Sequence, residues 1–428
     1  MNITIHRGID QIGGCITEIE SKNGTKILID LGHNLPEGDK PTNDPFDQQE
    51  NLESLLTGVS HIFYSHYHGD HLGFEGRVPS NITQHIGPLS LKMVKSLKNR
   101  ISRAVSLPPD VVQDAKDSLK ALNRFKPYSK KQPINCSDIS VTPYPVSHSA
   151  VDAYMFVVEC DGKRILHTGD FRDHGYRGED MLNDIKTEVK DIDILITEGT
   201  MLTRGDKRMM TEEALQMEAK EYFRKYKYAF VLCSSMDADR LVSFVEASQK
   251  LDESRRVDAD KYQVGQIIKI KKNLPEPYNE LFAYEVTKND QAEFSRMKRY
   301  GFTLFVRNSP SFDGLIESLR KQIDFTPDNT LFIYSQWEGY IDKNREKVYK
   351  QDLYDFTHRS YWHFEPLHTS GHASKDALRA VCEHFNPKVA IIPIHKEGKG
   401  TMSTLGLKVN CPIVESSTDI DDISITIL

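Results

Sequence analysis

Apolar and polar residues alternate in two different ways along the chain, and the change of pattern predicts two kinds of structure. Short apolar runs separated by turn residues, typical of strands, occupy most of the first 200 residues. Two stretches in that part, residues 91–105 and 109–125, carry apolar residues at spacings of three and four, which predicts helices. From about residue 201 helical and strand-like segments alternate, which is typical of βαβ units around a parallel sheet.

Several predicted strands end at a polar residue that could carry chemistry. In the first 200 residues, these strand-end residues are His66, His148, Asp170 and Glu198. A late apolar run, residues 389–394, ends in the same way at His395. Active sites commonly lie on loops at strand ends above a rigid sheet. Because one site residue comes so late, the sequence predicts that the alternating region is inserted into the first domain.

The composition indicates a globular protein with enough apolar material for a sizeable core. Hydrophobic residues make up 38% and charged residues 27% of the 428 residues. This length exceeds one ordinary compact domain, so two domains, or one domain with a large insertion, are expected. The formal net charge of −7 argues against a general electrostatic grip on nucleic acid. Binding of a polyanion would need a local basic cleft or bound cations.

The cysteine pattern and the absence of long apolar segments both favour a cytoplasmic location. No C-x-x-C pair occurs, which suggests neither a disulfide framework nor a thiolate zinc site. Buried free thiols in a reducing compartment are expected instead. No signal peptide and no run of ~18–20 apolar residues is found, so a cytoplasmic protein without membrane contact is expected. The six cysteines are Cys15, Cys136, Cys160, Cys233, Cys382 and Cys411.

The strongest chemical signal is the run HYHGDH, which begins at His66. Three imidazoles and a carboxylate this close together are difficult to explain as core or as solvated surface. Residues two apart on an extended loop point the same way, so His66 and His68 can share one metal. Gly69 allows a turn, after which Asp70 and His71 can face a second metal. Such nitrogen and oxygen ligands suit zinc, and would also accept manganese or iron.

Two metals need more ligands than this run holds. His148, Asp170 and His395 each directly follow an apolar strand. An isolated histidine is more often a structural residue, but the shared strand-end position favours all three as ligands. A carboxylate after a glycine could bridge two cations, which suits Asp170. Asp30 ends another apolar run, and we expect it to support the histidine loop as a hydrogen-bond acceptor rather than to bind metal.

This order of motifs resembles the metallo-β-lactamase superfamily. Its members have an early strand ending in Asp, then H-x-H-x-D-H, a lone His, a lone Asp and a late His. The resemblance implies an α/β fold, the four-layer αβ/βα sandwich, with two zinc ions per chain or manganese in their place. Asp170 would bridge the two ions. The other implied ligands form two sets: His66, His68 and His148 for one ion, and Asp70, His71 and His395 for the other.

Further features resemble the β-CASP nucleases within that superfamily. Glu198 in LITEGT resembles their first motif, His372 in HTSGHAS their second, and His395 in IPIHKE their third. A histidine at the third motif is typical of the RNA-processing branch, and the second motif is most similar to the ribonuclease J group. The resemblance implies a β-CASP αβ cap domain at residues 201–362. Residues 1–200 and 363–428 would then form the two parts of the metallo-β-lactamase domain.

The resemblance implies a ribonuclease that hydrolyses RNA phosphodiester bonds with a metal-activated hydroxide, as a 5′–3′ exonuclease, an endonuclease or both. The implied catalytic residues are Asp70, Glu198 and His372, with His372 as a proton donor that Glu198 orients. Single-stranded RNA in the cleft between the domains is the expected partner, and a homodimer is a further expectation. Phosphate groups would be bound by short loops near helix starts. These phosphate-binding candidates are Ser234, Ser235, His368, Ser370 and Gly371.

Three alternatives stay open at this point. A metallo-β-lactamase-fold hydrolase of a small ester, thioester or phosphodiester would have no need of the Glu198 and His372 pair. A non-catalytic β-CASP subunit that binds RNA would usually have lost metal ligands, whereas all the candidate positions are occupied here. A DNA-acting β-CASP nuclease is disfavoured by His395.

Overall fold

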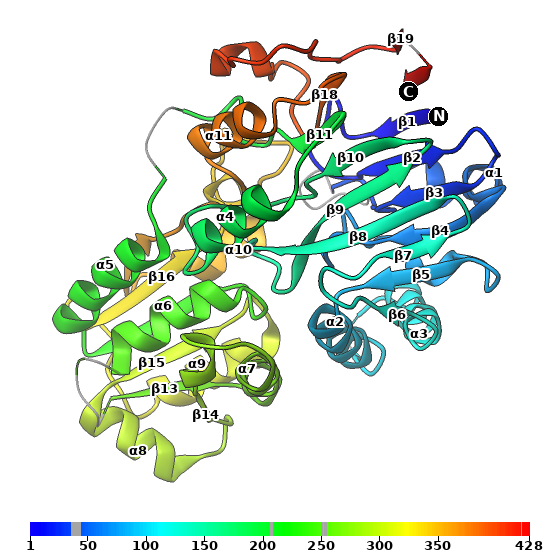
Figure 1. Ribbon diagram of the computed structural model, residues 1–428. Helices are drawn as coiled ribbons and strands as arrows, with labels where there is room; N and C mark the ends of the chain where they lie inside the picture. The colour runs from blue at the N-terminus through cyan, green and yellow to red at the C-terminus, as the bar shows by residue number, and fades with distance from the viewer. Residues whose placement is uncertain (36–43, 106, 206–208, 250, 252–254, 421) are drawn as a thin grey trace. The chain divides into compact units, whose positions relative to one another are not determined.

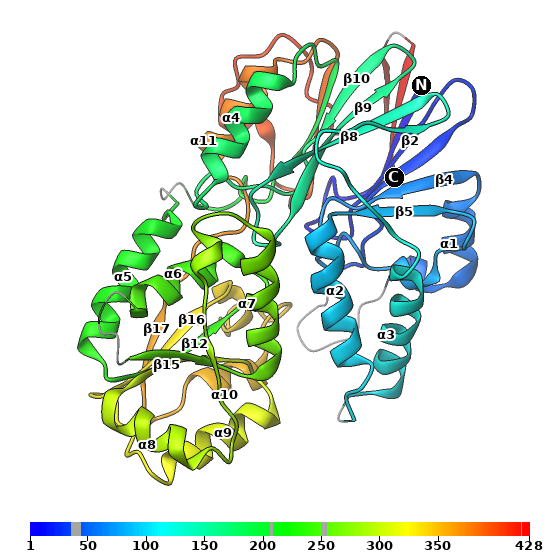
Figure 2. The same ribbon diagram turned by 60° about the horizontal axis from the view of Figure 1, so that its bottom comes forward.

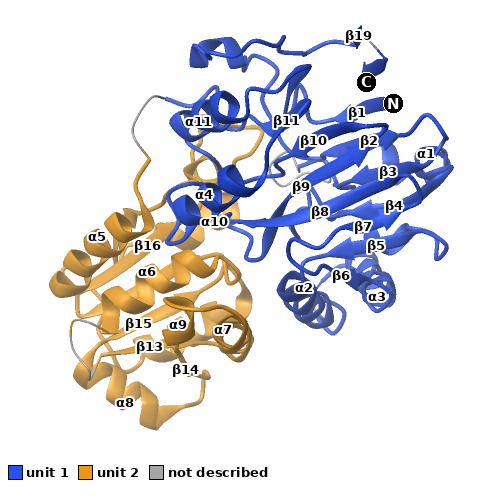
Figure 3. Cartoon of the chain, in the orientation of Figure 1, with its two compact units in different colours: residues 1–35, 41–208, 371–428 blue, residues 36–40, 209–370 orange. Residues whose placement is uncertain are grey.

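The computed structural model describes residues 1–428 except 36–43, 106, 206–208, 250, 252–254 and 421. These residues form two compact units, which Figure 3 colours differently. The first unit contains residues 1–35, the described part of 41–208, and 371–428, and the second contains residues 209–370. The chain therefore leaves the first unit and later returns to it. The chain enters the second unit at residue 209 and returns to the first at residue 371, in both cases a few residues after the domain limits expected from the sequence.

Two β-sheets form the centre of the first unit (Figure 1). Within the described residues, the first sheet has the strand order β19-β20-β1-β2-β3-β4-β5-β6 and the second β18-β11-β10-β9-β8-β7. The first comprises β1 (Asn2–Arg7), β2 (Ile16–Glu20), β3 (Lys26–Ile29), β4 (Val59–Phe63), β5 (Thr83–Ile86), β6 (Lys126–Pro127), β19 (Thr418–Ile420) and β20 (Ile423–Ile427). The second comprises β7 (Ile134–Cys136), β8 (Ile139–Val146), β9 (Ala153–Cys160), β10 (Lys163–His167), β11 (Ile194–Glu198) and β18 (Ala390–Ile394).

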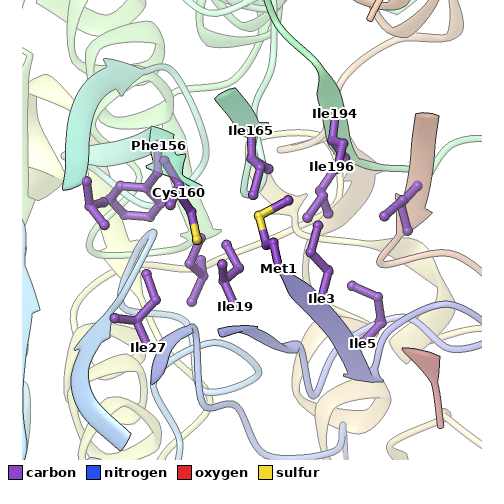
Figure 4. Close-up of a cluster of buried hydrophobic side chains, with 14 of the residues drawn as sticks. Met1, Ile3, Ile5, Ile19, Ile27, Phe156, Cys160, Ile165, Ile194 and Ile196 are labelled. Atoms are coloured by element: carbon purple, nitrogen blue, oxygen red, sulfur yellow. The ribbon is translucent and has the colours of Figure 1, made fainter. Parts of the chain in front are cut away.

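The core between these sheets follows from the alternation of side chains along the strands. Ile3 and Ile5 of β1 and Ile194 and Ile196 of β11 pack in one cluster, which Figure 4 shows. Leu195 packs on the opposite face of β11, with residues of α4 (Gly178–Glu188) and α11 (Lys375–Phe385). Because successive side chains of a strand point to opposite faces, β11 is buried on both sides, and its first three residues, Ile194, Leu195 and Ile196, are all apolar.

Helices accompany both sheets of the first unit and complete four layers. Figure 2 shows α2 (Pro88–Ile101) and α3 (Pro109–Leu122) beside each other, next to β5 of the first sheet. Helices α4 and α11 cover the outer face of the second sheet. This arrangement confirms the predicted αβ/βα sandwich. The other helical elements of this unit are α1 (Gln49–Leu56) and the 3-10 helices η1 (Pro45–Asp47), η2 (Glu75–Arg77) and η5 (Met402–Leu405).

The second unit is an alternating α/β domain around a parallel sheet. Within the described residues, its strand order is β14-β13-β15-β12-β16-β17, and these pairs are parallel. Its strands are β12 (Tyr228–Cys233), β13 (Arg256–Ala259), β14 (Tyr284–Glu285), β15 (Phe302–Val306), β16 (Thr330–Ser335) and β17 (His363–Pro366). Its helical elements are α5 (Glu212–Lys225), α6 (Ala238–Gln249), α7 (Lys261–Asn273), η3 (Tyr278–Glu280), α8 (Gln291–Tyr300), α9 (Pro310–Arg320), η4 (Glu338–Tyr340) and α10 (Gln351–Thr357). In the described part of the chain, no helix combines the length and apolarity needed to cross a membrane.

A stack of rings on β4 and β5 contains a buried histidine whose ring nitrogens make no hydrogen bonds to the described residues. The His85 ring stacks on Phe63 at 4.7 Å between centroids and on His61 at 5.5 Å. Neither nitrogen of His85 has a hydrogen-bond partner among the described residues, and the residue is 4% exposed. Burial, aided by the charges of His61 and Lys126, lowers the pKa of His85 to about 3. Protonation of His85 therefore favours the unfolded state.

We expect this histidine to make the protein less stable as the pH falls. The pKa of His85 is about 3 in the folded protein against an ordinary value of 6.5. Between these values the unfolded chain binds the proton first, so the free energy of unfolding falls by about 1.4 kcal/mol per pH unit. His85→Phe keeps the stack but takes up no proton, and its stability should depend less on pH. Urea unfolding at neutral pH and near pH 5 measures this, with the exposed His384→Phe as control; equal pH dependence in His85→Phe and wild type would contradict the expectation.

Candidate metal centre

The HYHGDH run forms a tight loop after β4. His71 N and Leu72 N both donate to His68 O, at 2.9 and 2.7 Å. The turn that the sequence predicts at Gly69 does not require glycine, because a Cβ added there would meet nothing within 4 Å. Gly32 is the position that requires glycine, since a Cβ there would lie 1.8 Å from Asp70 O. The loop therefore keeps its place by close backbone packing against residue 32.

One group of three histidines brings its ring nitrogens together. His66 Nε2 lies 3.1 Å and His148 Nε2 3.3 Å from His68 Nδ1. His148 Nδ1 donates to Gly371 O at 2.6 Å, and His66 Nδ1 lies 3.0 Å from Ser65 Oγ. These contacts leave the converging nitrogens free to bind a cation. We call His66, His68 and His148 the first ligand group.

A second group contains three of the four remaining predicted ligands. His395 Nε2 lies 3.2 Å and His71 Nε2 4.0 Å from Asp70 Oδ2. His71 Nδ1 donates to Asp30 Oδ2 at 2.7 Å, and Asp30 also accepts from Ser65 N and Ser65 Oγ. Asp30 thus contacts the ring nitrogen of His71 that faces away from Asp70. We call Asp70, His71 and His395 the second ligand group.

One oxygen of Asp170 lies between the two groups. Asp170 Oδ2 is 3.2 Å from His71 Nε2 and 3.6 Å from His395 Nε2. The same oxygen is 3.9 Å from the Nε2 atoms of both His66 and His148. Asp170 follows β10, and it is 2% exposed. A single carboxylate oxygen therefore faces ligands of both groups, which is the geometry that a bridging ligand requires.

Burial and mutual contact set the charge state of these residues. Burial lowers the pKa values of His66 and His148 well below the ordinary range and that of His68 to about 4. The first ligand group is therefore neutral near pH 7, the state in which imidazole binds metals. Burial opposes ionisation of Asp170, but His395, His71 and His372 outweigh it and hold the pKa of Asp170 well below its usual range. The ionised carboxylate of Asp170 and the neutral imidazoles of the first ligand group are donors that suit a divalent cation.

Glu198 and His372 form a pair beside Asp170. Glu198 ends β11, and its Oε2 lies 3.1 Å from His372 Nδ1. Its other oxygen accepts from Phe171 N at 2.9 Å and Ala373 N at 3.3 Å, which fixes the carboxylate. Glu198 is fully buried, whereas the His372 side chain is 22% exposed and so can reach a ligand from solvent. Burial opposes protonation of His372, but Glu198 and Asp170 outweigh it and raise the pKa of His372 to about 9.

The five predicted phosphate-binding residues are divided between the two units. Gly371 belongs to the first unit, and its carbonyl accepts from His148 Nδ1. Ser234, Ser235, His368 and Ser370 belong to the second unit. Ser234 Oγ accepts from Met236 N at 3.3 Å, and His368 Nδ1 accepts from the buried Arg240 at 3.0 Å. Of these five, Gly371 is the one that the structure places against the first ligand group.

Two residues near the centre were missed in the sequence. Thr200 Oγ1 lies 2.7 Å from His395 Nδ1 and 3.2 Å from His372 Nδ1, and it donates to His395 O. Its place two residues after Glu198 at a strand end was a usable signal. Cys15 Sγ lies with ring nitrogens of His71 and His395 in one cluster of potential ligand atoms. No local pattern marks Cys15, because its partners are far away in the sequence.

Comparisons with known proteins agree with this architecture. Residues 25–228 match the family model of the β-lactamase superfamily domain. A crystal structure of a protein of unknown function from Enterococcus faecalis V583 superposes with a TM-score of 0.71 at 20% identity, over 96% of this chain and 97% of that one. At this identity, the second similarity shows the fold alone.

Curated relatives have names that refer to ribonucleases. The chain is 26% identical over 198 residues to an RNase J-like protein of Methanocaldococcus jannaschii, covering 46% of this chain and 42% of that protein. It is 29% identical over 219 residues to endoribonuclease ysh1 of Schizosaccharomyces pombe, covering 48% and 26%. The aligned part is thus less than half the length of either relative. Residues 25–228 thus form a domain of the β-lactamase superfamily, and the curated relatives with which the chain aligns are named as ribonucleases.

Proposed function

We propose that the protein is a metal-dependent ribonuclease that hydrolyses phosphodiester bonds of RNA. The observation that carries this proposal is the position of Asp170 Oδ2 within 4 Å of histidines from both ligand groups, with His372 at 3.6 Å. A shared carboxylate beside a histidine–glutamate pair suits a two-metal hydrolase. The ribonuclease names of the relatives favour RNA as the substrate.

The donor chemistry of the site fits divalent metal ions. His71 Nε2 is buried and makes no hydrogen bond among the described residues, although it faces the Asp170 carboxylate at 3.2 Å. Such an atom is explained by a cation between it and the carboxylate. We propose that the first and second ligand groups each hold one zinc ion, with manganese as the alternative, and that Asp170 contacts both. When bound, the ions would lower the pKa of a water molecule and neutralise charge on the scissile phosphate.

The chain's own residues supply orientation and a proton. Asp30 and Thr200 hold the Nδ1 sides of His71 and His395, so that their Nε2 atoms face Asp70 and Asp170. Glu198 and Asp170 raise the pKa of His372 to about 9 against the opposing effect of burial, which favours its protonated form. Its Nδ1 contacts Glu198, which orients the ring, and we propose that the protonated ring donates its proton to the leaving oxygen.

Binding of the RNA chain involves residues whose roles stay predictions. We propose that Gly371, beside the first ligand group, and Ser234, Ser235, His368 and Ser370 of the second unit contact RNA phosphates. The second unit would then be the β-CASP cap, and the substrate would be single-stranded. The position of RNA between the domains, a homodimer and a cytoplasmic location are further predictions.

An assay with matched substrates tests the proposal. The metal-depleted full chain is mixed with 5′-phosphorylated or 5′-hydroxyl single-stranded RNA, DNA of the same sequence, or a thioester, and zinc or manganese is then added. We expect metal-dependent cleavage of RNA in preference to DNA and no thioester hydrolysis. Product length separates exonuclease from endonuclease action. A folded, metal-loaded protein that leaves RNA intact, or that hydrolyses only the thioester, would overturn the proposal.

A further inference from the structure

Cys15 stands apart from the other buried cysteines of the first unit. Cys136 and Cys160 pack in the core between the sheets, and Cys382 packs in the core that contains α11 residues. The Cys15 sulfur, in contrast, lies within 4.8 Å of ring nitrogens of His71 and His395, and all three residues are buried. Cys15 is 1% exposed. Cys15 is a buried free thiol, as the sequence predicts, but the sequence did not indicate these two histidine neighbours.

The backbone holds Cys15 in place against the second ligand group. Cys15 N donates to Asp70 O at 3.0 Å, and Gly32 N donates to Cys15 O at 3.2 Å. Gly8 packs closely on the other side, where an added Cβ would lie 3.3 Å from Cys15 Sγ and 3.4 Å from His395 N. Any larger residue at position 8 would push against the thiol or the His395 backbone. The thiol is thus fixed beside Asp70 and His395 by contacts that do not involve its own side chain.

A second observation points to a ligand at this place. His71 Nδ1 is engaged by Asp30, so the atom left to bind a ligand is Nε2. His71 Nε2 is buried, makes no hydrogen bond to the described residues, and lies 3.2 Å from Asp170 Oδ2 and 4.0 Å from Asp70 Oδ2. His71 is one of the two histidines that cluster with the Cys15 sulfur. A cation here would satisfy the imidazole nitrogen and meet the sulfur as well.

We propose that Cys15 is a thiolate ligand of the metal ion held by the second ligand group. This inference rests on the proposed metal centre. On binding, the S–H bond breaks, a metal–sulfur bond forms and one proton leaves to solvent, with no change in oxidation state. Thiolate is a soft ligand that favours zinc over manganese, whereas the imidazoles and carboxylates accept both. Cys15 therefore makes this position selective for zinc.

Cobalt(II) substitution tests for the metal–sulfur bond directly. Cobalt takes the place of zinc, its visible bands report binding, and a near-ultraviolet sulfur-to-cobalt charge-transfer band appears only with a thiolate ligand. We expect this band in wild type, its loss in Cys15→Ser, and its retention in Cys411→Ser, a half-buried cysteine away from the site. Wild type is informative by itself: visible bands without the charge-transfer band overturn the Cys15 inference but leave the metal centre intact. Absence of any cobalt binding overturns both.

Competition between metals gives an independent readout. Zinc affinity of the second site should fall by about tenfold or more in Cys15→Ser, while manganese affinity changes by less than about twofold. The ratio of the two affinities is the quantity to compare, because a general loss of structure lowers both. Circular dichroism of the metal-free variant checks its folding, and Cys15→Ala serves as a second variant. An unchanged zinc-to-manganese ratio in folded Cys15→Ser would contradict the inference.

Discussion

Replacement of Asp170 by alanine should reduce RNA hydrolysis by about 10³-fold or more. Asp170 Oδ2 lies within 4 Å of ring nitrogens from both ligand groups, so its removal takes away the donor that both metal positions share. Stabilisation by metal ions is worth several kcal/mol in the transition state, and each 1.4 kcal/mol is about tenfold in rate. Bound metal per chain should also fall, by about half or more.

The test needs evidence that the Asp170→Ala chain still folds. Asp170 is not part of the hydrophobic core clusters between the sheets or beside α11, so circular dichroism of the metal-free variant should match that of metal-free wild type. Asp193→Asn is a suitable control, because Asp193 directly precedes β11 and so lies at the opposite end of this strand from Glu198. Its carboxylate accepts a hydrogen bond from Arg164 N of β10. The control should retain metal and activity. Full nuclease activity in Asp170→Ala would defeat the proposed mechanism.

Replacement of His372 by alanine should slow turnover by about 10² to 10⁴-fold while the bound metal stays unchanged. This is the usual range for loss of a general acid. His372 contacts Glu198, and it belongs to neither ligand group, so metal content is expected to match wild type. Measurement of rate and metal content on the same sample separates this outcome from that of Asp170→Ala.

A change of leaving group gives a readout that a structural role would not produce. If His372 donates the proton to the leaving oxygen, a phosphodiester with a nitrophenolate leaving group needs no such proton. His372→Ala should therefore be impaired much less on that substrate than on RNA. His384→Ala is the matched control, since His384 is an exposed histidine of α11. An equal loss on both substrates would exclude His372 as the proton donor.

The stretch 260–300 is charged and its apolar periodicity is weak, so the apolar pattern of the sequence does not assign its elements. Its charged composition hides two helices, α7 and α8, whose apolar patterns are weak. Both begin with a capping aspartate: Asp260 accepts from Gln263 N and Asp290 accepts from Glu293 N. An acidic cap followed three residues later by Gln or Glu is a recognised helix start, so this signal was present in the sequence. The apolar pattern alone could not supply it.

The pairing of β20 with β1 in the first sheet could not be predicted from a local signal of this kind. Strand β20 pairs in parallel with β1, although the two strands come from opposite ends of the chain. Each is short and half-buried, and its partner is set by the rest of the fold rather than by neighbouring residues. Local patterns can indicate that a strand exists, but they carry no information on such a distant partner.

The sequence by itself indicated a strand-rich first part, an inserted region of alternating helices and strands, and the residues that are candidates for metal chemistry, because these patterns are local. The sandwich fold was implied by the resemblance of the motif order to a known superfamily. Only the tertiary structure decided how the candidates meet: Asp170 between two histidine groups, Thr200 against His395, and Cys15 beside His71. These contacts join residues on separate strands and loops, and they form only when the chain is folded, so no local pattern could reveal them.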